Sequence, residues 1–523
     1  MKIISKRFNT TGVCIPKKHY MVDISDNLKY IKNIIEQEKY FVINRTRQYG
    51  KTTTIYMLKQ YLKEEYIILS MSFEGMDSES FKNSKNFTST ILRLLSNSIR
   101  FNNREKSLQL LNMSKKTNSM VDLSDCITEF IMSCTQPVIL LIDEVDKNSN
   151  NELFLNFLGM LRNKYLSKEQ GEDITFQSVI LAGVYDIKNL KLKMRGNEER
   201  KYNSPWNIAV NFDVDMSFSV SQIENMLKDY CIEECVSMNI SQVSEEIYYY
   251  TSGYPFLVSR ICQVITEEVF ENKDIIVWDK YAIKKALKII ISENNTLFDD
   301  LIKNIENNEA FDKYVFELIM NNANRSFNID NPLINLGTVF GYLKNDNGKV
   351  RISNRIFEQR LYNYYSSKLE NKIDMSEYNF KQNFVTHTGL DMKKVLLKFQ
   401  MFMKEHYSSV DKEFIEREGR LLFLAFIRPI INGVGFDFKE VQASEEKRLD
   451  IVITYLNEKY IIELKIWHGQ EYHKKGIKQL DEYIISQGLN KGYLLIYNFN
   501  KSKEYKNEEI YTDNGMRIFS VYV

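Results

Sequence analysis

One segment constrains the fold of this chain more than any other: an apolar stretch, a polar loop that ends in Gly-Lys-Thr, and an amphipathic segment follow one another. These three parts are residues 40–43, 44–53 and 54–61. A strand, a loop with this ending and a helix form the arrangement that binds phosphate groups. The sequence therefore predicts a nucleotide-binding α/β unit in this part of the chain.

The loop offers several groups that suit a phosphate. Gly50 lets the backbone wrap around it, Lys51 can reach the β and γ oxygens, and Thr52 can supply a hydroxyl to Mg²⁺. The amides and the dipole of the following helix attract the anion. Arg45 stands where such loops usually have their first glycine, a departure that weakens the match. The nucleotide-binding residues expected in the loop are Arg47, Gly50, Lys51, Thr52 and Thr53.

A second run, residues 138–146, is an apolar strand whose end carries clustered carboxylates. Asp143 is expected to bind Mg²⁺, directly or through water, and Glu144 to orient and deprotonate the attacking water. By itself the run would equally suit a buried strand that ends in a solvated acidic turn. Its position after a Gly-Lys-Thr loop favours a nucleotide site with ATP and Mg²⁺ as cofactors.

Apolar runs alternate with amphipathic segments between residues 38 and 220, which predicts βα units on a largely parallel sheet. Strands are expected at 40–43, 66–70, 138–142, 176–182 and 209–212. Helical patterns follow to about residue 320, and a hairpin over 341–353 with a turn at 345–348 then suggests a winged-helix unit. A chain of 523 residues should divide into three domains, expected at 1–220, 221–375 and 376–523.

Two β-rich runs in the C-terminal part, residues 447–455 and 460–465, are joined by a short polar turn, which is the pattern of a hairpin. The strand period of two puts Glu463 and Lys465 on one face, and pairing across the turn can bring Asp450 beside them. The carboxylates offer hard oxygen ligands for Mg²⁺, and the lysine can orient or deprotonate a water and offset charge in the transition state. We expect Asp450, Glu463 and Lys465 to be required together for the cleavage of phosphodiester bonds and to be largely dispensable for folding.

A solvated hairpin face with mixed charge is the alternative, because an aspartate and a Glu-x-Lys at this spacing occur often by chance. The surrounding residues favour the chemical interpretation. Glu418 lies in a preceding helical stretch, and Gln479 and Tyr483 share one face of the following helix at a spacing of four residues.

Six segments within residues 8–370 in combination resemble the AAA-like and STAND-like P-loop ATPases of bacteria. They are residues 8–12, 19–23, 44–53, 142–147, 204–210 and 251–257. The last looks like the Gly-x-Pro segment of the helical lid in STAND and origin-binding ATPases, which implies that Pro255 packs on the nucleotide base. The resemblance implies a P-loop NTPase sheet with a helical lid and a winged-helix region.

The region over residues 410–500 resembles the PD-(D/E)xK nuclease superfamily, in particular the subgroup fused behind AAA-like ATPases. The resemblance implies a restriction-endonuclease-like α/β domain. It also implies a carboxylate on the first helix, two metal ligands, a catalytic lysine and the QxxxY pair of RecB-like members, which are in this order Glu418, Asp450 with Glu463, Lys465, and Gln479 with Tyr483. Leu449 stands where the name of the superfamily has proline.

The composition limits the partners. A formal net charge of +1 excludes a globally basic nucleic-acid coat, so a surface that binds DNA must be a local patch. The first twenty residues have no apolar stretch of signal-peptide length, and the longest apolar runs are far shorter than the ~20 residues that cross a bilayer. These patterns favour a cytoplasmic protein without a membrane segment, and a homo-oligomer is compatible with them.

Together the patterns predict an ATP-controlled, Mg²⁺-dependent nuclease that acts on nucleic acid, with DNA expected in preference to RNA. A role in bacterial defence or in mobile elements fits the resemblance. The first alternative is a STAND-like switch that binds nucleic acid or a protein partner without cutting. The second is an interaction scaffold with a degenerate ATP site, an idea prompted by Arg45.

Overall fold

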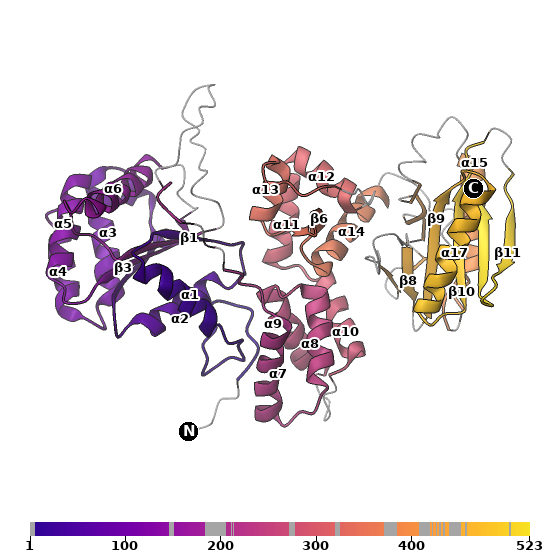
Figure 1. Cartoon of the computed structure of the whole chain (residues 1–523), viewed down its shortest axis with the longest axis horizontal. Coiled ribbons are helices and arrows are strands. Elements are labelled where there is room, and N and C mark those ends of the chain that lie inside the picture. Colours follow the sequence, from indigo (N-terminus) through magenta and orange to yellow (C-terminus); the bar gives the residue numbers. More distant parts are fainter. Residues whose placement is uncertain are drawn as a thin grey trace. The chain divides into compact units, whose positions relative to one another are not determined.

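The computed structural model describes residues 6–145, 151–183, 206–210, 212, 214–270, 278–319, 325–370, 384–386, 388–406, 419–420, 422–424, 426–427, 430–431, 435–438, 451–455, 458–500 and 504–523. Contacts divide the chain into two compact units. The N-terminal unit comprises Met1–Leu301 and Ser326–Ile356, and the C-terminal unit comprises Ile302–Arg325 and Phe357–Val523. Figure 1 labels many of the helices and strands of both units. The division into three domains stays a prediction.

The N-terminal unit contains a four-stranded parallel sheet with the strand order β1-β4-β3-β2. Figure 1 labels β1 and β3 of this sheet. Its strands are β1 (Phe41–Asn44), β2 (Ile67–Ser72), β3 (Val138–Asp143) and β4 (Ser178–Gly183). Each overlaps an apolar run from which a strand was expected. At residues 209–212 the described part of the chain shows one parallel bridge, between Phe41 and Val210.

Each face of this sheet has its own hydrophobic core, because successive strand residues point to opposite sides. On β3, Leu140 and Ile142 belong to one core, and Ile139 and Leu141 belong to the other. The first core lies against α3 (Ser84–Ile99), α4 (Arg104–Ser114), α5 (Met120–Met132) and α6 (Glu152–Glu169). The second lies against α1 (Ser25–Glu36) and α2 (Lys51–Leu62). Strands covered on both faces read as continuous apolar runs, which is why the sequence revealed them.

Four helices of the same unit pack on one another and are called here the helical bundle (Figure 1). They are α7 (Val220–Glu234), α8 (Ile240–Thr251), α9 (Pro255–Val264) and α10 (Lys280–Ser292). Ser219 starts α7 with a capping box, in which its side chain accepts from the Gln222 amide while the Gln222 side chain accepts from the Ser219 amide. The short α11 (Thr296–Glu306) follows the bundle.

The predicted hairpin is confirmed: β5 (Leu343–Asp346) pairs antiparallel with β6 (Lys349–Ile352), after α13 (Pro332–Val339). Asp346 pairs with Lys349, which leaves Asn347 and Gly348 as a two-residue turn. Both have positive φ, 49° and 79°, as the turn that matches the twist of two strands requires. The winged-helix assignment of this region stays a prediction.

A six-stranded mixed sheet forms the core of the C-terminal unit, with the order β11-β12-β10-β9-β8-β7. Its strands are β7 (Gly435–Phe438), β8 (Ile451–Tyr455), β9 (Glu458–Ile466), β10 (Lys491–Tyr497), β11 (Asn507–Tyr511) and β12 (Arg517–Tyr522). Strands β8 and β9 form the expected antiparallel hairpin, and α17 (Gln470–Ser486) connects β9 to the parallel β10. The other helices of this unit are α12 (Glu309–Ile319), α14 (Arg355–Glu370) and α15 (Met392–His406).

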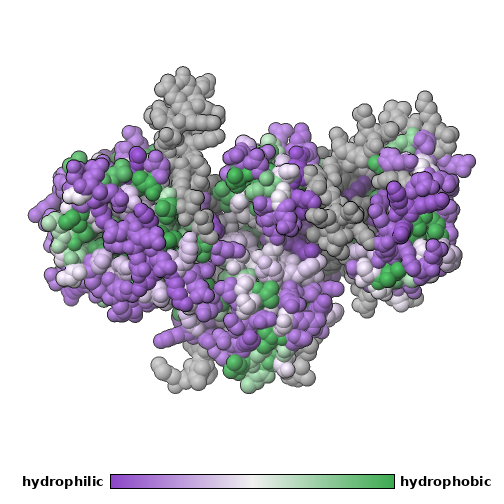
Figure 2. Space-filling model, in the orientation of Figure 1, coloured by the Kyte–Doolittle hydropathy of each residue, from purple (hydrophilic) through white to green (hydrophobic). Residues whose placement is uncertain are grey.

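Hydrophilic residues dominate the face of the molecule that Figure 2 shows, and the apolar residues on it form small, separate patches. Such scattered exposed apolar residues are normal for a folded chain. Among the helices of the described part, none has the length and apolar character needed to cross a membrane.

Candidate functional site

The loop between β1 and α2 has the backbone that the phosphate-binding motif requires. Gly50 adopts φ +82° and precedes the first residue of α2, and its carbonyl accepts the first helical hydrogen bond from the Thr54 amide at 2.9 Å. Gln48 also has a positive φ, 58°. The amides of the first turn of α2 have no partner within their own helix, so this end of α2 suits an anion.

Lys51 is the first residue of α2 and lies inside the loop. Its side chain is buried, with 7% of the residue exposed. The ammonium donates hydrogen bonds to the carbonyls of Arg45 and Thr46, both at 2.8 Å. The loop therefore positions the charge of Lys51 with its own main chain, in the middle of the segment where phosphate oxygens are expected.

Arg45, which replaces the usual glycine, sends its side chain toward the segment that follows the bridge at Val210. Its guanidinium donates to the carbonyls of Asn44 at 2.8 Å and Val214 at 2.6 Å. It also lies 5.8 Å from the centre of the Phe212 ring. The Arg45 guanidinium therefore contacts other parts of the protein. Although Arg45 replaces the usual glycine, the loop still places two of its carbonyls around the Lys51 ammonium.

Asp143 and Glu144 leave the sheet at the edge from which the loop also starts, because parallel strands end on the same side. Strand β4 lies between β1 and β3, so the ends of β1 and β3 are about 10 Å apart at the usual strand spacing. The amide of Glu144 donates to a carboxylate oxygen of Asp143 at 2.9 Å. Glu144 has φ +54°, a conformation that non-glycine residues rarely adopt and that is frequent at functional sites.

The Asp143 carboxylate also affects the pKa of Lys59, a lysine of α2. Lys59 donates to the Ser70 hydroxyl at 2.8 Å. Burial lowers the pKa of Lys59, and the charge of Asp143 acts in the opposite direction. The electrostatic influence of Asp143 therefore extends to the helix that carries Lys51.

The other expected residues of the loop contact protein neighbours. Arg47 is mostly exposed and forms an ion pair of 3.2 Å with Asp300. The hydroxyl of Thr53 accepts a hydrogen bond from the Cys14 amide at 3.1 Å. Thr52 is exposed in the first turn of α2.

The Gly-Tyr-Pro segment of the helical bundle lies against this loop. Pro255 is buried and is the first residue of α9. Tyr254 donates a hydrogen bond to the Arg47 carbonyl at 2.8 Å. Sequence reasoning missed Tyr254, and the only signal for it was its place between Gly253 and Pro255.

In the C-terminal unit the structure brings three of the expected residues together. Lys465 of β9 forms an ion pair of 2.8 Å with Glu463 on the same strand and donates to the Gln479 side chain of α17 at 3.5 Å. Glu463 is 1% exposed, whereas the Lys465 side chain is 22% exposed. Glu463 and Lys465 thus face α17, as the strand period of two predicts.

Of the remaining expected residues of this unit, Tyr483 is described by the structure. Tyr483 is buried in the core under α17 with Leu480 and Ile484, and its hydroxyl has no hydrogen-bond partner among the described residues. Asp450 and Glu418 lie outside the described residues. Within the described part of the chain, no cluster of three or more His, Cys, Asp or Glu residues could hold a metal ion.

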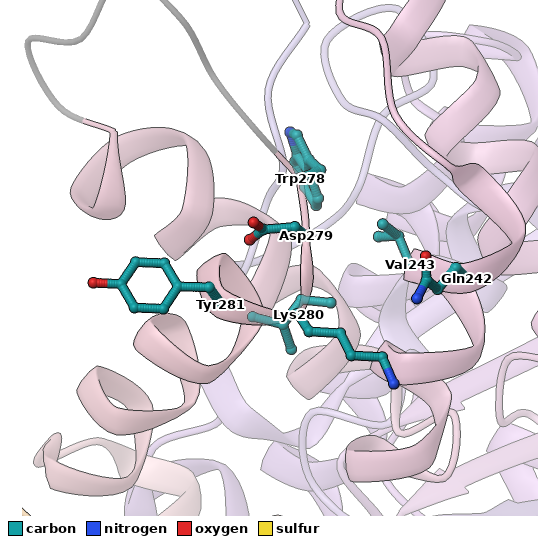
Figure 3. Close-up of a pocket in the computed structure, with 7 residues that line it drawn as sticks. Gln242, Val243, Trp278, Asp279, Lys280 and Tyr281 are labelled. Carbon is teal, nitrogen blue, oxygen red and sulfur yellow. The ribbon is translucent and has the colours of Figure 1, made fainter. Parts of the chain in front are cut away.

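A hollow of about 380 Å³ lies in the helical bundle, between α8 and the start of α10 (Figure 3). Gln242, Trp278 and Lys280 are among its lining residues. The carboxylate of Asp279 caps α10 by accepting from the Ala282 amide at 2.8 Å, and Tyr281 points away from the other labelled side chains. The polar groups of this hollow do not converge on one point, so it is not a candidate site.

Three solved structures resemble the chain at low sequence identity. The Walker-type ATPase PABY2304 of Pyrococcus abyssi is 11% identical with a TM-score of 0.45, over 68% of this chain and 99% of that chain. The ORC1 protein of Aeropyrum pernix, solved in complex with DNA, is 10% identical with a TM-score of 0.31, over 67% and 94%. The RuvB Holliday junction branch migration motor of Thermotoga maritima is 12% identical with a TM-score of 0.32, over 63% and 92%.

No curated protein matches the chain. The AAA-like domain family matches residues 17–362, a range that runs from the segment before α1 into α14. That range includes the loop around Lys51, the acidic end of β3 and the helical bundle, and it is more than half of the 523 residues. The chain belongs to the AAA-like domain family.

Proposed function

We propose that the N-terminal unit binds ATP together with Mg²⁺ and hydrolyses the nucleotide. The observation that carries this proposal is the loop that holds the Lys51 ammonium with two of its own carbonyls, at the sheet edge where Asp143 and Glu144 also lie. Lys51 would bind the β and γ phosphates, and Glu144 would orient the attacking water and accept its proton. Arg47, Thr53 and Pro255 are proposed contacts of the same nucleotide.

The donor groups of the site suit magnesium. Mg²⁺ prefers hard oxygen ligands and commonly takes one or two protein oxygens together with phosphate oxygens. Thr52 and Asp143 offer a hydroxyl and a carboxylate of this kind. When bound, the ion would offset the negative charge of the phosphate groups.

The nucleotide proposal is tested by titrating the purified chain with ATP in the presence of Mg²⁺ and by measuring phosphate release. Saturable binding and turnover are expected. A chain that is folded, as judged by its melting curve, but neither binds nor hydrolyses ATP would overturn the proposal.

For the C-terminal unit we infer a PD-(D/E)xK nuclease that cuts phosphodiester bonds with Mg²⁺. What supports this proposal is the convergence of Glu463, Lys465 and Gln479 from a strand and a helix. Ile451 pairs with Ile462, so Asp450 and Glu463 each adjoin, in the sequence, a member of the same cross-strand pair. Asp450 and Glu463 are the proposed metal ligands. Lys465 is the proposed catalytic lysine, and Glu418, Gln479 and Tyr483 are proposed to support the site.

The burial of Glu463 favours a second candidate function. A carboxylate that is 1% exposed and paired with a lysine resembles an internal ion pair as well as a metal ligand. In this second candidate the chain is a STAND-like switch, which binds nucleic acid or a protein partner under control of ATP without cutting.

One experiment separates the two functions. The purified chain is incubated with plasmid DNA, linear DNA and RNA, each with and without Mg²⁺ and ATP, and binding and cleavage are measured on the same samples. Mg²⁺-dependent cleavage that is lost in a folded Lys465→Ala variant supports the nuclease. Binding that depends on ATP, with no cleavage of any substrate, supports the switch. The proposed partner is nucleic acid, DNA in preference to RNA, and the proposed location is the cytoplasm; gel filtration with and without ATP tests a homo-oligomer.

A further inference from the structure

Four consecutive residues of the phosphate-binding loop contact the helical bundle or the helix after it. The Thr46 hydroxyl lies 3.2 Å from the Tyr254 hydroxyl, and the Arg47 carbonyl accepts from Tyr254 at 2.8 Å. Gln48 donates to the Thr296 hydroxyl at 3.1 Å. The Tyr49 ring packs edge-on against the Tyr254 ring, with 4.7 Å between the ring centres. Tyr254 therefore takes part in three of the four contacts.

The direction of the hydrogen bonds follows from the single proton of a tyrosine hydroxyl. Because Tyr254 donates to the Arg47 carbonyl, it accepts from Thr46. Burial raises the pKa of Tyr254, and the Thr46 hydrogen bond acts in the opposite direction, so the hydroxyl stays protonated at neutral pH. Tyr254 is 3% exposed, and a buried donor that lost its acceptor would be costly.

The two neighbours of Tyr254 fix its position in the bundle. Gly253 has φ +74°, and a Cβ at this position would lie 2.1 Å from the Phe218 carbonyl oxygen. The Gly253 carbonyl accepts from the Phe218 amide at 2.8 Å. Pro255 starts α9 with its fixed φ. The Tyr254 ring is thus tied to the position of α9 and cannot follow the loop independently.

Thr46 connects this tyrosine to the lysine that would bind phosphate. Its side chain contacts Tyr254, while its carbonyl accepts from the Lys51 ammonium at 2.8 Å. On its other side, a Cβ at Gly341 would lie 2.9 Å from a methyl group of Thr46, so Thr46 has little room to move. The Thr46 carbonyl thus helps to position the ammonium that is proposed to bind phosphate, and Tyr254 holds the Thr46 hydroxyl and the Arg47 carbonyl.

We propose that Tyr254 is a positioning residue of the nucleotide site, whose hydroxyl holds the Thr46–Arg47 stretch in the conformation that presents Lys51 and thereby links nucleotide affinity to the position of α9. The inference rests on the proposed nucleotide site. By linkage, a bundle that favours nucleotide binding must itself be favoured by bound nucleotide. The proposed effect depends on the hydroxyl oxygen of Tyr254 alone, because the ring contact with Tyr49 remains when that oxygen is removed.

The test uses the full chain with Tyr254→Phe, which removes the hydroxyl and keeps the ring. Tyr365→Phe is the matched control, because Tyr365 is also buried and donates to a carboxylate oxygen of Asp312 at 2.7 Å, outside the nucleotide site. ATP affinity, turnover and melting temperature are measured for the wild type and both variants. Hydrogen exchange of the peptide that covers residues 255–264 is followed with and without ATP.

Tyr254→Phe should weaken ATP binding about 2- to 10-fold, the usual effect of one lost hydrogen bond, while kcat at saturating ATP stays close to that of the wild type. The protection of residues 255–264 by ATP should shrink in the same variant. Both variants should lower the melting temperature by a similar amount, because each loses a buried hydroxyl. Tyr365→Phe should leave the ATP affinity and the protection of residues 255–264 unchanged. Equal ATP affinity and equal protection in wild type and Tyr254→Phe would overturn the inference. A wild type that binds no ATP would instead overturn the proposed nucleotide site.

Discussion

At the scale of one residue, Lys51 is a buried ammonium held by two carbonyls of the loop that is proposed to bind phosphate, so its removal has a sharp expected effect. Hydrogen bonds to a charged group contribute roughly 1.5–3 kcal/mol, so Lys51→Ala should weaken ATP binding about 10- to 100-fold. Lys63→Ala is the control, because Lys63 is exposed just after the end of the same helix. Calorimetric titration measures both. Equal affinity in the wild type and Lys51→Ala would remove the ATP site.

Glu144 is expected to matter for turnover and not for binding. The Glu144 amide donates to the Asp143 carboxylate and its backbone has φ +54°; a glutamine can keep both features, because neither depends on the Glu144 carboxylate. Glu144→Gln should bind ATP as the wild type does and lose about 10²- to 10⁴-fold in kcat, the usual range for a general base. Phosphate release under saturating ATP is the measurement. Wild-type turnover in this variant would assign the base to another residue.

The ion pair of Glu463 and Lys465 indicates that these two residues contribute to folding, which was not expected from the sequence. Both were expected to be dispensable for folding, but Glu463 is almost fully buried and Lys465 neutralises it. Lys465→Met should therefore destabilise the fold by about 3–5 kcal/mol, because it leaves a buried charge without its counterion. Glu463→Gln combined with Lys465→Met should recover most of that stability, since neither charge of the pair remains.

The double variant separates folding from catalysis. Chemical denaturation compares the stability of the single and double variants, and cleavage is measured on the same preparations. We expect a double variant that is nearly as stable as the wild type but does not cut. A double variant that cuts at the wild-type rate would show that the ion pair is structural and would remove Glu463 and Lys465 from the proposed nuclease site.

At the scale of an element, Gly253 controls how α9 meets the loop before α7. Gly253→Ala should cost at least about 2 kcal/mol of unfolding free energy, because the positive φ and the close Phe218 carbonyl both act against a side chain. Gly171→Ala is the matched control: Gly171 has a similar φ, +75°, but nothing within 4 Å of its Cβ position. Thermal or denaturant unfolding gives the two values. An equal loss in both variants would show that the clash with Phe218 is relieved without cost.

Several strands and both hairpins could be predicted from the sequence. Parallel strands buried on both faces appear as apolar runs, so β1 to β4 were visible, and the Asn-Gly turn between Asp346 and Lys349 marked the hairpin of β5 and β6. The hairpin of β8 and β9 was visible because its apolar runs flank a polar turn. These signals are local, which is why periodicity and turn residues reveal them.

Contacts between distant parts of the sequence could not be predicted in this way. Thr46 and Tyr254 are 208 residues apart, and nothing in either local pattern indicates that they meet. The burial of Glu463 also depends on how α17 covers β9, which the pattern Glu-x-Lys does not contain. The candidate residues were visible in the sequence, but their surroundings, which decide their chemistry, were not.

At the scale of the whole molecule, the chain is proposed to carry both an ATP site and a site that cuts phosphodiester bonds. ATP can control cleavage only if it distinguishes two arrangements of the chain, and then nucleic acid must change ATP affinity by the same factor. Typical coupling energies are about 1–3 kcal/mol, which corresponds to roughly 5- to 150-fold. ATP titrations with and without a saturating DNA duplex measure this factor. Identical ATP affinity in the two titrations would show that the sites act independently.

Control of cleavage by ATP is measured as the rate at which the purified chain cuts linear DNA with Mg²⁺, with no nucleotide, with ADP, with ATP and with a non-hydrolysable ATP analogue. Lys51→Ala and the double variant of Glu463 and Lys465 are measured in parallel. We predict cleavage that changes with the nucleotide in the wild type, does not respond to nucleotide in Lys51→Ala, and is absent in the double variant. Cleavage at one rate under all four nucleotide conditions, or an undiminished rate in the double variant, would contradict this prediction.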